Sequence, residues 1–158
     1  MNAPQHLDAA GIRQRIPHQG RMALLNALSG WSDTHIDCRV TNHADPAHPL
    51  RSAGGLLAPS AIEYAAQAMA LHASLRAAAG ATPRGGFLAS ARSVVMHVPR
   101  LDDAAGPLAV RAERLAGDER QAMYRFTMHD AAGLPLVEGR CTVVLDGVPS
   151  NREPAPHP

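Results

Sequence analysis

One strong helix pattern, in a chain whose other patterned segments alternate like strands, most constrains the fold. Residues 59–75 are dominated by Ala, Leu, Met and Gln, which favour helix. Pro59 suits the first helical position because its fixed φ and missing N–H cost nothing there. Gly80 stands where such a helix would end. The many small residues of this helix would let a sheet wrap closely around it.

The segments around the helix predict strands. Residues 34–40 alternate between apolar and polar side chains, as in a half-buried strand, whereas residues 22–31 are apolar and ambiguous in period. Four strand-like runs follow the helix, and their short connections predict antiparallel neighbours. The fold class expected is therefore α+β, with one long central helix against a curved antiparallel sheet. The four runs span residues 87–98, 108–115, 121–129 and 137–145.

The length and composition indicate one globular domain. The chain has 158 residues, of which 46% are hydrophobic and 18% are charged, enough for a real core. We expect a loose N-terminal segment over residues 1–12 and a folded domain over residues 13–146. Residues 147–158 are rich in proline and carry no periodic pattern, so we expect a disordered tail.

Charge and motif content argue against several classes of protein. A net charge of +1 with His neutral argues against binding to nucleic acid driven by net charge. No run of apolar residues is long enough to span a membrane, and residues 1–7 lack the pattern of a signal peptide. Cys38 and Cys141 match no metal-site spacing. We expect two reduced thiols in a cytoplasmic protein, with no cofactor and no metal.

The stretch that leads into the helix contains a candidate acid–base pair. His48 lies in a Pro-rich loop that cannot be helical, and Gly54 and Gly55 connect this loop to the helix. Glu63 falls about one turn inside the helix, among small and apolar neighbours. A carboxylate there is rarely buried unless it is paired. The two side chains could share acid–base work, although a loop histidine can equally bond a backbone carbonyl.

These motifs resemble the 3-hydroxyacyl-[acyl-carrier-protein] dehydratases of type II fatty-acid synthesis. In that family a Pro-His pair precedes an apolar run, and a catalytic His in a Pro-rich loop precedes a helix with Glu-Ala-x-Ala-Gln. The chain is most similar to the dehydratase-like proteins of aryl polyene pigment clusters, over residues 13–146. The matching segments are 16–18, 22–26, 48–67, 86–90 and 100–103.

The resemblance implies a fold, a reaction and partners. The expected fold is the hot-dog fold, a sheet wrapped around one helix and usually built from dimers. The expected enzyme is a hydro-lyase that dehydrates 3-hydroxyacyl thioesters to trans-2-enoyl thioesters in fatty-acid or aryl-polyene-type biosynthesis. Its substrate would be linked through phosphopantetheine to an acyl carrier protein. The partner subunit would be a second copy or a related dehydratase, with His48 and Glu63 supplied by different subunits.

Each site residue implied by the resemblance has an expected role. His48, which titrates near neutrality, would take the C2 proton. Glu63 would protonate the leaving hydroxyl. An apolar surrounding raises the pKa of Glu63 whereas the helix N-terminus lowers it, and both effects stay open. Gln67 would either orient Glu63 or fill the core.

The remaining expectations concern the thioester and its acyl chain. Negative charge on the thioester oxygen needs an N–H donor at the helix start. Pro59 has none, so the donor would be Ala58 or a residue near Gly55. An apolar tunnel would hold the acyl chain. Its candidate walls are Leu56, Ile62 and Phe87.

Two alternatives remain beside the dehydratase. A hot-dog acyl thioesterase would use a carboxylate and a bound water, and it would not need His48. A non-catalytic subunit would complete the active site of a related dehydratase. Four other histidines in the domain are expected to be structural or solvated, namely His18, His43, His72 and His97.

Overall fold

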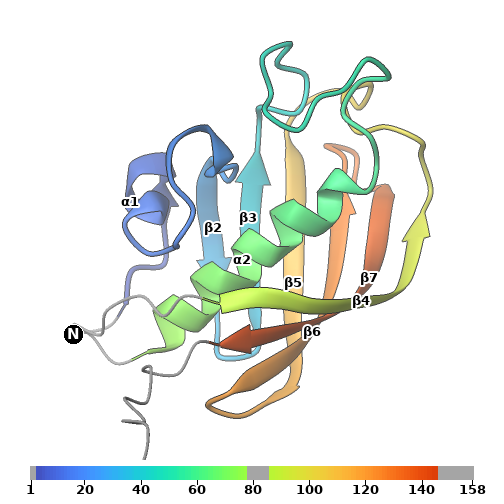
Figure 1. The fold of residues 1–158 in the computed structure, drawn as a ribbon. Coiled ribbons are helices and arrows are strands. Elements are labelled where there is room, and N and C mark those ends of the chain that lie inside the picture. The colour runs from blue at the N-terminus through green and yellow to red at the C-terminus, as the bar shows by residue number, and fades with distance from the viewer. Residues whose placement is uncertain (1–2, 78–85, 146–158) are drawn as a thin grey trace, which may run out of the picture.

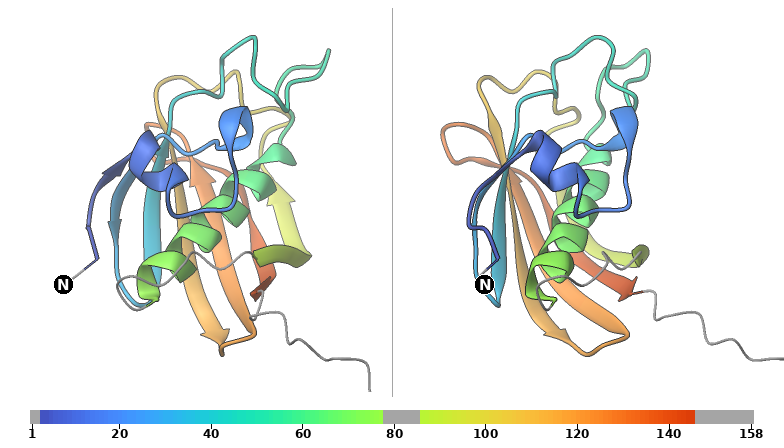
Figure 2. Two further views of the ribbon diagram at one scale, coloured as in Figure 1. Left: turned by 60° about the vertical axis from the view of Figure 1, so that its left-hand side comes forward. Right: turned by 90° about the vertical axis from the view of Figure 1, so that its left-hand side faces the viewer.

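The computed structural model describes residues 3–77 and 86–145. One antiparallel sheet of seven strands, in the order β1-β2-β3-β5-β6-β7-β4, curves around the long helix α2 (Figures 1 and 2). The expected α+β arrangement is confirmed. The elements are β1 (Leu7–Asp8), α1 (Ala9–Arg13), η1 (Gly20–Met22), β2 (Ala27–Trp31), β3 (His35–Val40), α2 (Ser60–Arg76), β4 (Gly86–Met96), β5 (Leu108–Gly117), β6 (Gln121–His129) and β7 (Pro135–Leu145).

The core lies between α2 and the concave face of the sheet. Three alanines of α2, Ala61, Ala65 and Ala68, are fully buried, and their short side chains let the helix lie close to the strands. The alternation along β6 matches the strand prediction, since Tyr124 and Phe126 face the helix and are buried. Burial of this apolar surface is the main favourable contribution to folding.

One strand of the sheet, β4, does not pair with the strand that follows it in the sequence, as its short connection had predicted. β5, β6 and β7 pair in sequence, but β4 pairs with β7 instead of β5. The connection after β4 pairs instead with the segment before α2, because Ala58 N–H donates to Pro99 and Leu101 N–H donates to Leu56. β4 therefore lies at an edge of the sheet.

The N-terminal segment is also more ordered than expected. Within residues 1–12 the chain forms β1 and most of α1. Asp8 caps α1 by accepting a hydrogen bond from Gly11 N–H at 2.8 Å, and Ile12 is buried in the core. The Trp31 indole N–H donates to the Pro4 carbonyl at 2.8 Å. Elements this short carry too little periodicity to be predicted from sequence. The expectation of a loose segment over residues 1–12 is therefore wrong for residues 7–12, which are ordered.

The expected tail over residues 147–158 and the expected helix end at Gly80 lie outside the described residues. Among the described helices, none combines the length and the apolar character needed to cross a bilayer.

Candidate active site

The loop before α2 is held in place by a buried carboxylate. Asp102, whose side chain is only 4% exposed, accepts from Leu56 N–H at 3.0 Å and from Arg100 Nε at 2.9 Å. Arg51 lies 3.3 Å away on the other oxygen. The hydrogen bonds from Arg100 hold the pKa of Asp102 well below its usual range. At Gly55, φ is +97°, and a Cβ would lie 2.6 Å from the Arg100 guanidinium, so this position requires glycine.

Three of the candidate N–H donors before the helix are occupied within the chain. Ala58 N–H donates to the Pro99 carbonyl at 3.0 Å, and Gly55 N–H donates to Ser52 at 3.0 Å. Leu56 N–H is taken by Asp102. These three N–H groups are therefore not free to serve as the oxyanion donor. The N–H groups of Gly54 and Leu57 have no hydrogen-bond partner among the described residues, so a donor near Gly55 stays a prediction.

Glu63 is held by two side chains on one of its oxygens. Its Oε1 accepts from Gln67 Nε2 at 3.0 Å and lies 3.3 Å from His18 Nε2. The hydrogen bond from His18 lowers the pKa of Glu63 most, the bond from Gln67 lowers it further, and burial opposes both. The side chain stays 35% exposed. At neutral pH this residue is therefore an oriented carboxylate that still reaches the surface.

Gln67 serves both of the roles that we had left open. It is fully buried, where its Oε1 accepts from Leu24 N–H at 2.8 Å and its Nε2 donates to the Met22 carbonyl at 2.7 Å. The same Nε2 reaches Glu63. Gln67 therefore links the Glu63 carboxylate to the backbone at the end of η1 and just after it.

The contact between His18 and Glu63 could not be predicted from the sequence. We expected His18 to be structural or solvated, yet its Nε2 lies against the carboxylate. The Pro17-His18 pair was visible as a motif, but nothing in its spacing predicted which residue it would contact. Its Nδ1 is buried and has no hydrogen-bond partner among the described residues. This favours the tautomer that donates from Nε2, since a buried N–H without an acceptor is costly.

His48 is buried, at 5% exposure, and both of its nitrogens are hydrogen-bonded. Its Nδ1 accepts from Leu50 N–H at 3.0 Å, and its Nε2 lies 2.7 Å from the Tyr64 hydroxyl. Tyr64 donates to Asn42 Oδ1 at 2.6 Å, and Asn42 Nδ2 donates to the Leu24 carbonyl at 2.9 Å. Burial is the main cause that lowers the pKa of His48, so the ring is neutral at neutral pH.

The two predicted catalytic residues thus belong to separate networks. Glu63 contacts His18 and Gln67, whereas His48 contacts the next helical residue, Tyr64. No hydrogen bond or ion pair joins His48 to Glu63 in the part of the chain that the structure describes. The resemblance implies that the His48 and Glu63 of one active site come from different subunits.

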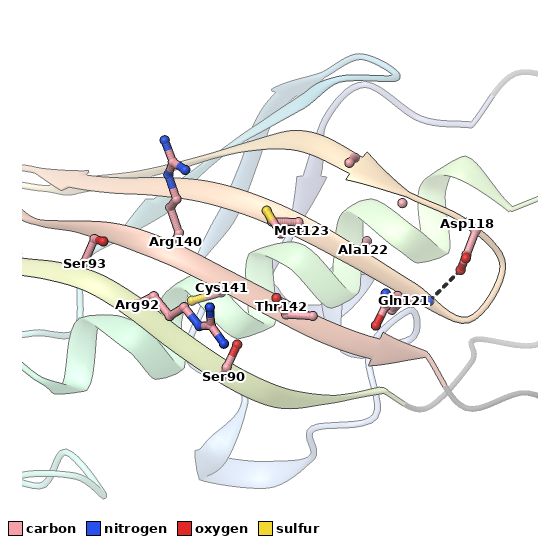
Figure 3. A pocket seen from close by; sticks show the side chains of 12 residues that line it. Ser90, Arg92, Ser93, Asp118, Gln121, Ala122, Met123, Arg140, Cys141 and Thr142 are labelled. Atoms are coloured by element: carbon pink, nitrogen blue, oxygen red, sulfur yellow. Dashed lines mark hydrogen bonds between the residues drawn. The ribbon is translucent and has the colours of Figure 1, made fainter.

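A cavity lies on the other side of the sheet. It has a volume of about 750 Å³ and opens over β4, the end of β5, β6 and β7, on the face turned away from α2 (Figure 3). Arg92 and Arg140 lie opposite each other across β4 and β7 at this face, beside Ser90 and Thr142. No group of three or more metal-ligating side chains occurs within residues 3–77 and 86–145.

Comparison with known proteins identifies the family. The model of the ApeP-like family, described as ApeP dehydratase, matches residues 10–150. The chain belongs to this family. No curated protein matches the chain.

Solved structures place this ApeP-like chain among hot-dog proteins. The dehydratase heterocomplex ApeI:P from Xenorhabdus doucetiae is 26% identical with a TM-score of 0.74, over 86% of this chain and 91% of that chain. The thioesterase HI1161 from Haemophilus influenzae is 12% identical with a TM-score of 0.66, over 96% and 99%. AziG from S. sahachiroi is 14% identical with a TM-score of 0.57, over 80% and 94%. The last two likenesses show the fold alone, and the expected hot-dog fold is confirmed.

The three residues predicted to line the acyl tunnel differ from one another in their surroundings in this ApeP-like chain. Leu56 is fully buried in the core, and Ile62 is half-buried against it. The Phe87 side chain lies outside what the structure describes. The tunnel itself stays a prediction, because its other wall would come from a second subunit.

Proposed function

We propose that this chain takes part in the dehydration of 3-hydroxyacyl thioesters to trans-2-enoyl thioesters. The substrate would be carried on the phosphopantetheine of an acyl carrier protein, in fatty-acid or aryl-polyene-type biosynthesis. The observation that carries the proposal is the oriented Glu63 carboxyl in the first turns of α2, held by His18 and Gln67. Membership of a dehydratase family supports it.

The reaction needs two proton-handling groups. A base removes the C2 proton, and an acid protonates the hydroxyl at C3 as the C–O bond breaks and water leaves. We assign the acid to Glu63. Covering Glu63 with an apolar acyl chain removes water from its carboxyl and raises its pKa, which is the direction that an acid requires. The base is a histidine that faces Glu63 from another subunit.

The second subunit has two candidate identities. In a homodimer the base would be His48 of the second copy. In a heterodimer it would be a histidine of a related dehydratase, and the ApeI:P complex is an assembly of that kind. The edge strand β4 supports either assembly, because it exposes apolar side chains that a partner would cover. These are Leu88, Val95 and Met96.

The proposal is tested by assaying the assembled protein with 3-hydroxyacyl carrier protein and measuring the loss of one water by mass spectrometry. Glu63→Gln keeps the shape of the side chain but removes the acid, so we expect kcat to fall on the order of 10²-fold or more. Glu119→Gln, in the exposed turn between β5 and β6, is the matched control and should match the wild type. Wild-type turnover in Glu63→Gln, with an unchanged circular dichroism spectrum, would make Glu63 a structural residue.

A thioesterase is the second candidate, and the lowered pKa of Glu63 is the observation that favours it. A carboxylate can activate a water to attack a thioester carbonyl. Saturated acyl thioesters, which have no hydroxyl to lose, separate the two activities. Release of free thiol from them, without dehydration of 3-hydroxyacyl substrates, would establish the thioesterase.

A further inference from the structure

The hydrogen bonds around His48 fix the position of its proton from one end. Asn42 donates from Nδ2 to the Leu24 carbonyl at 2.9 Å, so its Oδ1 faces the Tyr64 hydroxyl at 2.6 Å. A hydroxyl has one proton to give, and Tyr64 gives it to Asn42. The Tyr64 oxygen therefore accepts from His48, whose Nε2 lies 2.7 Å away.

The other end of the ring gives the same answer. Leu50 N–H points at His48 Nδ1 at 3.0 Å, and a backbone N–H can only donate, so Nδ1 carries no proton. Moving the proton from Nε2 to Nδ1 would place two donors face to face in a buried position, which is costly. In this tautomer neither nitrogen has a free lone pair with which to accept the C2 proton of a substrate.

The same chain of hydrogen bonds links His48 to the helix that carries Glu63. Tyr64 is the residue after Glu63 on α2 and is fully buried. The backbone of Leu24 joins the two networks, since its carbonyl accepts from Asn42 and its N–H donates to Gln67. His48 and Tyr64 thus hold the turn of α2 that presents Glu63, while Gln67 holds the carboxyl itself.

We propose that His48 of this chain is a positioning residue that acts through Tyr64, and that the histidine which accepts the C2 proton belongs to a related dehydratase subunit. This inference rests on the proposed dehydration. A second copy of this chain would bring a His48 in the same tautomer, so in a homodimer the His48 that faces Glu63 has both nitrogens hydrogen-bonded. A heterodimer supplies the missing base.

The first test compares His48 variants in the chain assembled with a related dehydratase subunit, such as ApeI. His48→Gln keeps an N–H donor for Tyr64, so we expect dehydration to stay within a few-fold of the wild type. His48→Ala and Tyr64→Phe break the chain of hydrogen bonds and should lower kcat more. Glu63→Gln should lose about 10²-fold or more. A folded His48→Gln variant that loses as much activity as Glu63→Gln would overturn the inference.

The second test reads the tautomer directly and does not depend on activity. Long-range ¹H–¹⁵N NMR spectra of the chain, alone and in the heterodimer, should show a protonated Nε2 and a bare Nδ1 at His48. His97, on the exposed segment after β4, serves as the reference for a solvent-exchanging ring. A bare Nε2 at His48 would overturn the inference. The absence of dehydration in every assembly would instead remove the proposed function, together with the role given to the partner histidine.

Discussion

At the scale of residues, two neighbouring side chains of α2 contact different histidines. Glu63 lies against His18, and Tyr64 lies against His48. The two contacts have different electrostatic consequences. The first keeps a partly exposed carboxyl ionised, whereas the second ties a neutral imidazole into a buried network. The chemistry of the site therefore depends on which histidine contacts which helical position.

Removing His18 should raise the pKa of Glu63, since the hydrogen bond from His18 is the main cause that lowers it. A ¹³C NMR pH titration of the Glu63 carboxyl in His18→Ala should show this. Because the folded-state pKa is depressed, Glu63 adds stability above its unfolded pKa, and that stability is lost as pH falls through the folded value. In His18→Ala this contribution should be smaller.

The matched control for that titration is His35→Ala. His35 also lies near a carboxylate, with its Nε2 3.7 Å from Asp37, but it is on β3 and has no contact with Glu63. It should leave the titration of Glu63 unchanged. An unshifted Glu63 in His18→Ala would show that the contact does not control the carboxyl.

At the scale of elements, α2 carries a second buried histidine that fastens it to the sheet. His72 is fully buried, with Nε2 2.6 Å from the Ser32 carbonyl and Nδ1 2.8 Å from the Tyr124 hydroxyl. Burial is the main cause that lowers its pKa to about 4, and the charges of Arg76 and Arg114 act in the same direction. Its location confirms the expected structural role.

His72 should make the stability of the fold fall in mild acid. Its folded pKa of about 4 lies below the ordinary value of 6.5, so between these values the unfolded chain binds more protons. Stability is then fully present above pH 6.5 and is lost as pH falls towards 4, by roughly 3 kcal/mol. Urea denaturation at a series of pH values measures this loss. His72→Gln, which cannot titrate, should flatten the dependence relative to wild type.

At the scale of the whole molecule, the single chain leaves its sheet open at β4. Exposed apolar residues of that strand lie at the edge of the sheet, where backbone groups are available for pairing. The proposed function also places the histidine base on a second subunit. Assembly and activity should therefore be lost together.

Val95→Glu should disrupt that assembly, because it places a charge on a side chain that is 46% exposed on β4 and that a partner would bury. Light scattering should show a dimer, or a multiple of it, for the wild type, and a smaller species for the variant. Dehydration by the chain combined with a related dehydratase subunit should be lost in the variant. Leu134→Glu, at a side chain that is 64% exposed between β6 and β7, is the control and should change neither. A stable wild-type monomer that still dehydrates would contradict the shared site.

The local structure and the family could both be predicted from the amino-acid sequence. Short-range periodicity is a property of neighbouring residues, so the long helix and the strand-like runs could be predicted from it, and Pro59 marked the helix start to within one residue. The motif around Glu63 identified the dehydratase family, because spacing along one helix is preserved in the fold. The short elements β1 and α1 carry too few residues for either signal.

Only the tertiary structure decided which distant residues meet. The pairing of β4 with β7 depends on the segment after β4 pairing with residues 56–58, which no local pattern encodes. The contact of His18 with Glu63 and the tautomer of His48 depend on segments far apart in the chain, joined at Leu24. A side chain's pKa and tautomer follow from burial and from the donors around it, and these exist only after the chain has folded.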